Sequence, residues 1–99
     1  MTGVPGPRPN DAFVRKADVL DSAVDDLVVA LDTRSGNCFS FSGPSRRIWD
    51  LLESPASAAD LSRHLVGEFD IEEAACLEET LEYLARLESE GLVHRAPAS

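Results

Sequence analysis

The side chains that could carry covalent or metal chemistry are few and lie far apart in this chain. The two cysteines, Cys38 and Cys76, form no CxxC pair, and only His64 and His94 could join them as zinc ligands. This spacing fits no zinc-ligand pattern. In a reducing cytosol we expect both cysteines to be small buried residues rather than a disulfide or a metal pair. The sequence therefore predicts no metal and no other cofactor.

Catalytic chemistry is equally poorly supported. The chain has no combination of nucleophile, base and acid and no glycine-rich phosphate loop. Glutamates are abundant, but helical spacing distributes Glu78, Glu79 and Glu82 over a solvated face. We therefore expect a binding protein and not an enzyme.

The side chains best spaced for recognition lie on a long predicted helix that begins near Asp70 and ends at Gly91. At about 100° per residue, one apolar stripe is expected to face the core; it holds Ala74, Leu77, Leu81 and Leu84. A second stripe flanks it and holds Cys76, Thr80, Tyr83 and Leu87. A helix with one neighbour usually needs only one such stripe. The second stripe therefore either packs within the fold or contacts a partner, and Tyr83 favours a partly wet groove.

Three β-prone runs precede the helices, at residues 19–24, 27–31 and 38–41. Asp25 and Asp26 form a plausible tight turn between the first two runs, and residues 32–37 carry turn chemistry between the others. We predict a three-stranded antiparallel meander, with a short extra strand at residues 13–14. Phe39 and Phe41 share one face of the last strand and are expected in the core, so that Cys38 and Ser40 face outward.

The helical half is marked by caps and stops. A first helix begins near Pro44 and ends before Pro55, with Trp49 as a packing anchor and an inward face made of Ile48, Leu51 and Leu52. A second helix opens with Ser57 and an acid three residues later, and its inward face is made of Ala58, Leu61 and Leu65.

Two sequence patterns mark the start and the end of the long third helix. Asp70 and Glu73 repeat the capping pattern at its start. Gly91 ends it, with Leu92 placed to contact Leu87 in a Schellman closure, and residues 93–95 are predicted to form a strand stub. The short turn between the second and third helices is typical of a helix-turn-helix.

Composition limits the class of partner. The 99 residues suit one domain, 13–96, after a flexible proline- and glycine-rich segment, 1–12. The net charge is −9, and 12 of the 18 acidic residues lie at or after Asp50, which disfavours nucleic acid. No apolar run approaches the roughly 18–20 residues of a membrane span. The start of the chain lacks the apolar stretch of a signal peptide, so we expect a cytoplasmic protein without membrane contact.

The run from Leu27 to Glu53 resembles the PqqD-like family, as do Leu61, the Glu68-Phe-Asp-Ile71 joint and the closing segment from Leu87 to Val93. The resemblance covers about residues 18–95. Members are recognition elements for ribosomally made, post-translationally modified peptides. Many members have Tyr and Asn where this chain has Ser40 and Ser42.

The resemblance implies an α+β fold, a winged helix-turn-helix with a three-stranded antiparallel sheet followed by three helices. It also implies that a precursor's leader peptide adds as a β-strand between the third strand and the third helix. The predicted peptide-binding residues are Asn37, Cys38, Phe39, Ser40, Phe41, Cys76, Thr80, Tyr83, Leu84 and Leu87. Enzyme partners in the family are a leader peptidase and cyclase in lasso-peptide systems, or a radical SAM enzyme.

Two alternatives remain open from the residues alone. Winged helices commonly bind DNA, although the glutamates that begin the third helix oppose phosphate binding. A general protein–protein adaptor would use the same groove. An exposed strand edge also permits a homodimer.

Overall fold

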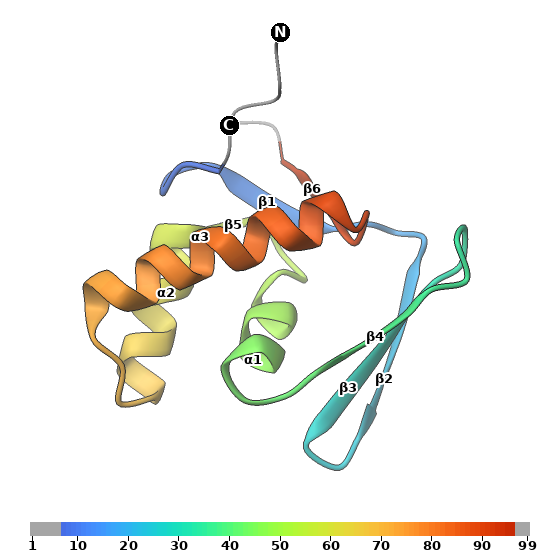
Figure 1. Cartoon of the computed structure of the whole chain (residues 1–99), viewed down its shortest axis with the longest axis horizontal. Helices are drawn as coiled ribbons and strands as arrows, with labels where there is room; N and C mark the ends of the chain where they lie inside the picture. The colour runs from blue at the N-terminus through green and yellow to red at the C-terminus, as the bar shows by residue number, and fades with distance from the viewer. Residues whose placement is uncertain (1–6, 97–99) are drawn as a thin grey trace, which may run out of the picture.

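The computed structural model describes residues 7–96 and shows an α+β fold with three helices and two small antiparallel sheets (Figure 1). The elements, in chain order, are β1 (Ala12–Arg15), β2 (Val19–Val24), β3 (Leu27–Asp32), β4 (Cys38–Phe41), α1 (Gly43–Leu51), β5 (Ala56–Ser57), α2 (Ala58–Glu68), α3 (Glu73–Ser89) and β6 (Val93–Arg95).

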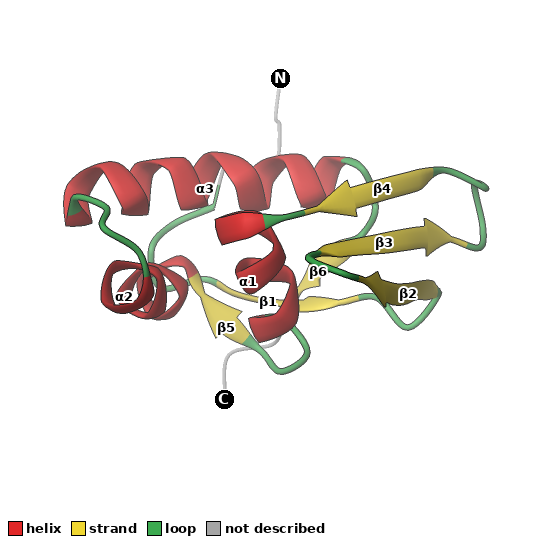
Figure 2. Ribbon diagram, turned by 90° about the horizontal axis from the view of Figure 1, so that it is seen from below, coloured by secondary structure: helices red, strands yellow, loops and turns green. Residues whose placement is uncertain are grey.

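The predicted meander is confirmed. Its strands have the order β2-β3-β4, all antiparallel, so that β4 lies at an edge of the sheet (Figure 2). Val24 pairs with Leu27 across a two-residue turn, as predicted, and Asp25 in that turn has a φ of 56°. Aspartate tolerates this left-handed conformation better than most residues.

A second sheet, of order β5-β1-β6, was not predicted from the sequence. The extra strand expected at residues 13–14 exists as β1, and the stub at 93–95 exists as β6; the two pair antiparallel. On its other side β1 pairs with β5, which has only two residues. A strand of this length has no periodicity for a sequence pattern to detect.

Contacts near the start of the chain begin before residue 13. Ala59 donates a backbone hydrogen bond of 2.9 Å to the Pro9 carbonyl, and the Arg8 amide donates to the Asp11 carboxylate at 2.9 Å. Residues 1–6 of the predicted N-terminal segment lie outside the described residues.

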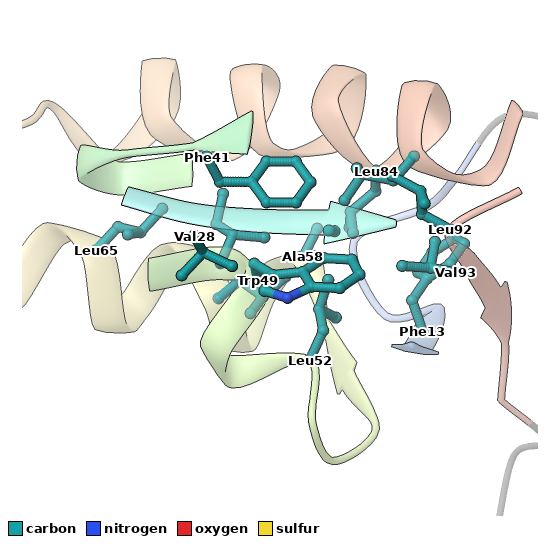
Figure 3. Packing of buried hydrophobic residues seen from close by; sticks show 14 of the residues in the cluster. Phe13, Val28, Phe41, Trp49, Leu52, Ala58, Leu65, Leu84, Leu92 and Val93 are labelled. Atoms are coloured by element: carbon teal, nitrogen blue, oxygen red, sulfur yellow. The ribbon is translucent and has the colours of Figure 1, made fainter. Parts of the chain in front are cut away.

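The core lies where the helices meet the inner face of the β2-β3-β4 sheet and the strands β1 and β6, which contribute Phe13 and Val93 (Figure 3). Trp49 is fully buried, which confirms its role as a packing anchor. Its ring stacks on Phe41, with centroids 4.9 Å apart. The inward faces predicted for α1 and α2 are also confirmed, although Leu51 is only half-buried.

The cap prediction is right for α2 and wrong for α3. Ser57 and Asp60 form a reciprocal capping box, in which the Asp60 amide donates to the Ser57 hydroxyl at 3.2 Å. The N-cap of α3 is Glu72, which makes no side-chain capping bond. The predicted Asp70 cap lies two residues too early, because a tight turn, in which the Ile71 amide donates to the Phe69 carbonyl at 3.0 Å, precedes the N-cap at Glu72.

The buried face of α3 is rotated from the predicted one. Its buried residues are Cys76, Thr80, Leu84 and Leu87. Ala74, expected in the core, is exposed, while Leu77 and Leu81 are half-buried against the core's margin. The flanking stripe therefore lies mainly inside the fold. An assignment based on leucine spacing misses this face because two of its four buried residues, Cys76 and Thr80, are small and not leucines.

The predicted Schellman closure of α3 is confirmed. Leu92 donates to the Leu87 carbonyl at 3.0 Å, and Gly91, at a φ of +81°, donates to the Glu88 carbonyl at 3.1 Å. This closure sends the chain back from α3 into β6.

Replacing Gly91 by alanine is expected to lower the free energy of unfolding by about 1–2 kcal/mol, because a Cβ disfavours the left-handed conformation. Gly67→Ala is the matched control: Gly67 lies in α2 with open space where its Cβ would be, and alanine there should raise stability by about 0.5 kcal/mol. Urea denaturation followed by circular dichroism measures both. Equal effects of the two substitutions would contradict this account of the closure.

Candidate functional site

The free edge of β4 offers unpaired backbone groups. The Asp32 amide donates to the Asn37 carbonyl at 3.0 Å, and these two residues lie in register just beyond the ladder. Hydrogen-bonded and non-hydrogen-bonded pairs alternate in an antiparallel ladder. Phe39 and Phe41 therefore direct their backbone groups toward β3, whereas Cys38 and Ser40 direct their N–H and C=O groups away from it.

A pocket of about 230 Å³ lies between β4 and α3. It is lined by Phe39, Ser40, Phe41, Ser45, Tyr83, Arg86, Leu87, Glu90 and Leu92. Small-molecule sites usually measure about 300–1,000 Å³. A smaller hollow beside a strand edge is suited to a few side chains of an extended peptide.

A second pocket, of about 250 Å³, lies where the three helices meet. It is lined by Pro44, Ser45, Ile48, Leu65, Ile71, Cys76, Glu79, Thr80 and Tyr83. Most of these side chains are apolar, so the pocket is suited to an apolar group. Ser45 and Tyr83 line both pockets and form the wall between them.

Tyr83 is the most unusual polar group of the site. Among the described residues, its hydroxyl is the one buried side-chain oxygen or nitrogen without a hydrogen-bond partner. Burial raises the pKa of Tyr83 to about 12 from 10.0, although Ser45 and Arg86 oppose the rise. The Ser45 hydroxyl itself donates to the Ser42 carbonyl at 2.7 Å. A ligand that reaches Tyr83 could supply the missing hydrogen bond.

Opposite charges border the β4–α3 pocket. Arg86 on α3 and Glu90, the C-cap of that helix, are both exposed and four residues apart. By contrast, Arg46 and Arg47 on α1 have partners within the fold: Arg46 donates to the Asp25 carbonyl at 2.9 Å, and Arg47 pairs with Glu68 at 2.9 Å. Of these three arginines, Arg86 is the one positioned to meet a charged group in the groove.

The predicted site residues fall into four groups. Phe39, Ser40, Phe41, Tyr83 and Leu87 converge on the β4–α3 pocket, and Cys76 and Thr80 line the helical pocket with Tyr83. Asn37 and Cys38 are exposed at the start of the same edge. Leu84 is fully buried in the core and lines neither pocket.

Sequence reasoning missed several of the lining residues. Arg86 and Glu90 could have been found, because they lie three and seven residues after Tyr83 on the same side of a helix. Ser45 carries no sequence signal, since its place between the pockets depends on how α1 packs against α3.

The two cysteines differ from the expectation that both are buried. Cys76 is buried, with its sulfur 4.0 Å from the Thr80 hydroxyl, but Cys38 is exposed, and neither forms a disulfide. Cys38 faces outward because Phe39 and Phe41 take the inner face of β4. No helix within residues 7–96 has the length and apolar character needed to cross a membrane.

Comparison with known proteins gives the family. Residues 28–93 match the family described as coenzyme PQQ synthesis protein D (PqqD). The chain belongs to the PqqD family, and this confirms the resemblance inferred from the sequence. No curated protein matches the chain.

Two solved structures share the fold. One is described as TbiB1 in complex with the TbiA(beta) leader peptide; it has 22% sequence identity and a TM-score of 0.77, over 87% of this chain and 99% of that one. The other is described as lasso peptide synthetase B1 complexed with the leader peptide; it has 22% identity and a TM-score of 0.74, over 83% and 96% of the two chains. The winged helix-turn-helix description of the fold stays a prediction.

Tyr83 is the only tyrosine in the chain, so absorbance at alkaline pH reports its titration directly. We expect a midpoint near pH 12 in the folded protein, and a midpoint near pH 10 in concentrated guanidinium chloride. The folded state holds the proton more tightly, so stability should fall as the pH rises from 10 toward 12. Tyr83→Phe should remove this loss. A midpoint near 10, with circular dichroism showing an intact fold, would contradict the buried hydroxyl.

Proposed function

We propose that this protein binds the leader region of a ribosomally made precursor peptide and performs no chemistry itself. The observation that carries the proposal is the free edge of β4, where Cys38 and Ser40 direct backbone groups outward beside a small pocket. An extended peptide would add to this edge as a fourth strand of the β2-β3-β4 sheet.

Affinity and selectivity would come from different parts of the groove. The main-chain bonds of Cys38 and Ser40 act on any peptide that can form a strand, so they contribute affinity. The pocket between β4 and α3 would receive those side chains of the peptide that point toward Tyr83 and Leu87. Arg86 would favour an acidic residue nearby, because its guanidinium group is exposed at the pocket's border.

The buried residues predicted as contacts have a more limited role in this proposal. Cys76 and Thr80 would form the floor of the helical pocket, and Leu87 that of the β4–α3 pocket. Only a part of each side chain can meet a peptide, since each is 3% exposed or less. Tyr83 is half-buried and borders both pockets, so it would make the larger contact.

Membership of the PqqD family supports this function, as do two structural neighbours whose descriptions name a bound leader peptide. On the same analogy, the protein would present the peptide to a processing enzyme. A lasso-peptide leader peptidase is the first candidate, because one neighbour is described as a lasso peptide synthetase component. A radical SAM enzyme is the second.

The DNA-binding alternative is disfavoured by charge. The first turns of α3 carry Glu72, Glu73, Glu78 and Glu79, all exposed. A recognition helix inserted by this end would bring these carboxylates toward phosphates.

Binding is best tested by fluorescence anisotropy with a labelled leader peptide from the protein's precursor. We expect micromolar or tighter affinity. Ser40→Pro should weaken binding about tenfold, because proline removes an outward N–H without breaking a bond to β3. Ser40→Ala is the matched control: it keeps the N–H and should bind as the wild type does. Equal affinity of the proline and alanine variants, both folded, would contradict strand addition.

A second test examines the pocket. Tyr83→Ala should weaken the same interaction about tenfold or more through loss of a large contact at the centre of the groove. Ala74→Ser, at an exposed position near the start of α3, is the control and should not alter affinity. Circular dichroism and a thermal melt establish that both variants are folded. Unchanged affinity for Tyr83→Ala would exclude this pocket from the binding site.

A gel shift with duplex DNA at low salt tests the competing function. We expect no shift, because the net charge is −9 and the end of α3 that would enter a groove is acidic. A salt-sensitive shift at micromolar protein would favour the transcription-factor alternative.

A further inference from the structure

The face of the β2-β3-β4 sheet turned away from the core is largely apolar. Along β3, Val28, Ala30 and Asp32 are buried, and the residues that alternate with them point to the other side. The strand register then defines the outer sheet face, which consists of Leu20, Ser22, Val24, Leu27, Val29, Leu31, Cys38 and Ser40.

This face is exposed in the part of the chain that the structure describes. Leu20, Val24 and Leu27 are 60%, 54% and 37% exposed, and they are the large hydrophobic residues most open to solvent there. Figure 2 shows the sheet extending to one side of α1, with β4 nearest α3 and β2 farthest from it. An antiparallel sheet in water usually carries polar residues on its open face. A contiguous exposed apolar surface is typical of an interaction site.

We propose that the outer sheet face is the docking surface for the enzyme that processes the bound leader peptide. This inference rests on the proposed function. The exposed centre of this face lies on β2 and β3, whereas the peptide would occupy the free edge of β4, where the face ends at Cys38 and Ser40.

The charges around the face identify the chemistry of the partner. Asp18 precedes β2, and Asp25 and Asp26 follow it; all three are exposed. Two arginines lie near these carboxylates: the Arg34 guanidinium is 3.9 Å from the Asp18 carboxylate, and Arg46 donates to the Asp25 carbonyl at 2.9 Å. Two copies packed through this face would bring like charges together, and each chain carries a net charge of −9. The complementary partner is a protein surface that is apolar at its centre and has lysine or arginine at its border.

The geometry also links docking to peptide binding. Successive side chains of a strand point to opposite faces. A peptide strand beside β4 would therefore turn half of its side chains toward the pocket and the other half onto the outer sheet face, next to Cys38 and Ser40. An enzyme docked on this face would contact the sheet and the peptide together, so it should bind the loaded protein more tightly than the empty one.

Two neighbouring residues give a matched test. Val24 is on the outer sheet face, while Ala23 precedes it on the opposite face and is also exposed. Biolayer interferometry would measure binding of the purified leader peptidase that cleaves the same precursor, with and without leader peptide. We expect Val24→Glu to weaken enzyme binding at least tenfold and Ala23→Glu to have little effect.

The charged border is tested separately. Replacing Asp18 and Asp26 by asparagine should also weaken enzyme binding and reduce the dependence of that binding on salt.

The outcomes separate this inference from the proposed function. Leader affinity, measured by anisotropy, should be the same in Val24→Glu as in the wild type. If no variant and no wild-type protein binds leader, the proposed function fails. If leader binds normally but the enzyme does not bind, or does not distinguish Val24→Glu from Ala23→Glu, the docking surface is wrong. A wild-type dimer in sedimentation velocity that Val24→Glu converts to a monomer would instead assign the face to self-association and overturn the proposal.

Discussion

The ring of Phe41 lies between two other aromatic rings, and this contact fixes β4 relative to α1 and α3. Phe41 stacks on Trp49 with centroids 4.9 Å apart and meets Tyr83 edge-on at 6.3 Å. Each such pair contributes about 0.5–1.5 kcal/mol beyond the burial of area. Because one face of β4 is packed on the core, a slip of one residue in its register would turn Phe41 to the opposite face. The aromatic contact anchors the end of β4, and with it the backbone of Ser40.

Trp49 is in turn held by polar groups from both sheets. Its indole N–H donates to the Asp21 carboxylate of β2 at 2.8 Å, and Arg15 of β1 lies over its ring at 4.7 Å. Arg15 also donates to the Trp49 carbonyl at 2.8 Å and pairs with Asp21 at 3.0 Å. The two sheets share no strand pairing, so these contacts connect them, directly through Arg15 and Asp21 and also through Trp49 of α1. The groove thus depends on residues from β1 and β2 that never approach it.

Local signals explain which parts of the fold could be predicted. The turn at Asp25, the cap at Ser57 and the closure at Gly91 depend on residues a few positions apart, and all three are present in the structure. The second sheet depends on β5, whose two residues become a strand only when β1 lies beside them. Helical periodicity located the apolar side of α3, but not its centre. The centre of the buried face includes the small residues Cys76 and Thr80, which follow from how α3 packs on the rest of the fold and not from the spacing of its leucines.

In the candidate site too, some features follow from the local sequence and others from tertiary packing. This difference determines which residues of the site can change without loss of the fold. The edge of β4 was predictable because a meander leaves its last strand with one neighbour, whereas Ser45 enters the site only through tertiary packing. If a groove binds a peptide through main-chain hydrogen bonds, many side-chain types are compatible with binding at its edge strand. The residue type matters more at positions that hold the strand in place, which here are Phe41 and its aromatic neighbours Trp49 and Tyr83. Ser40 and Ser42, where many members of the family have Tyr and Asn, are therefore compatible with strand addition, because Ser40 would contribute its backbone groups and Ser42 caps α1.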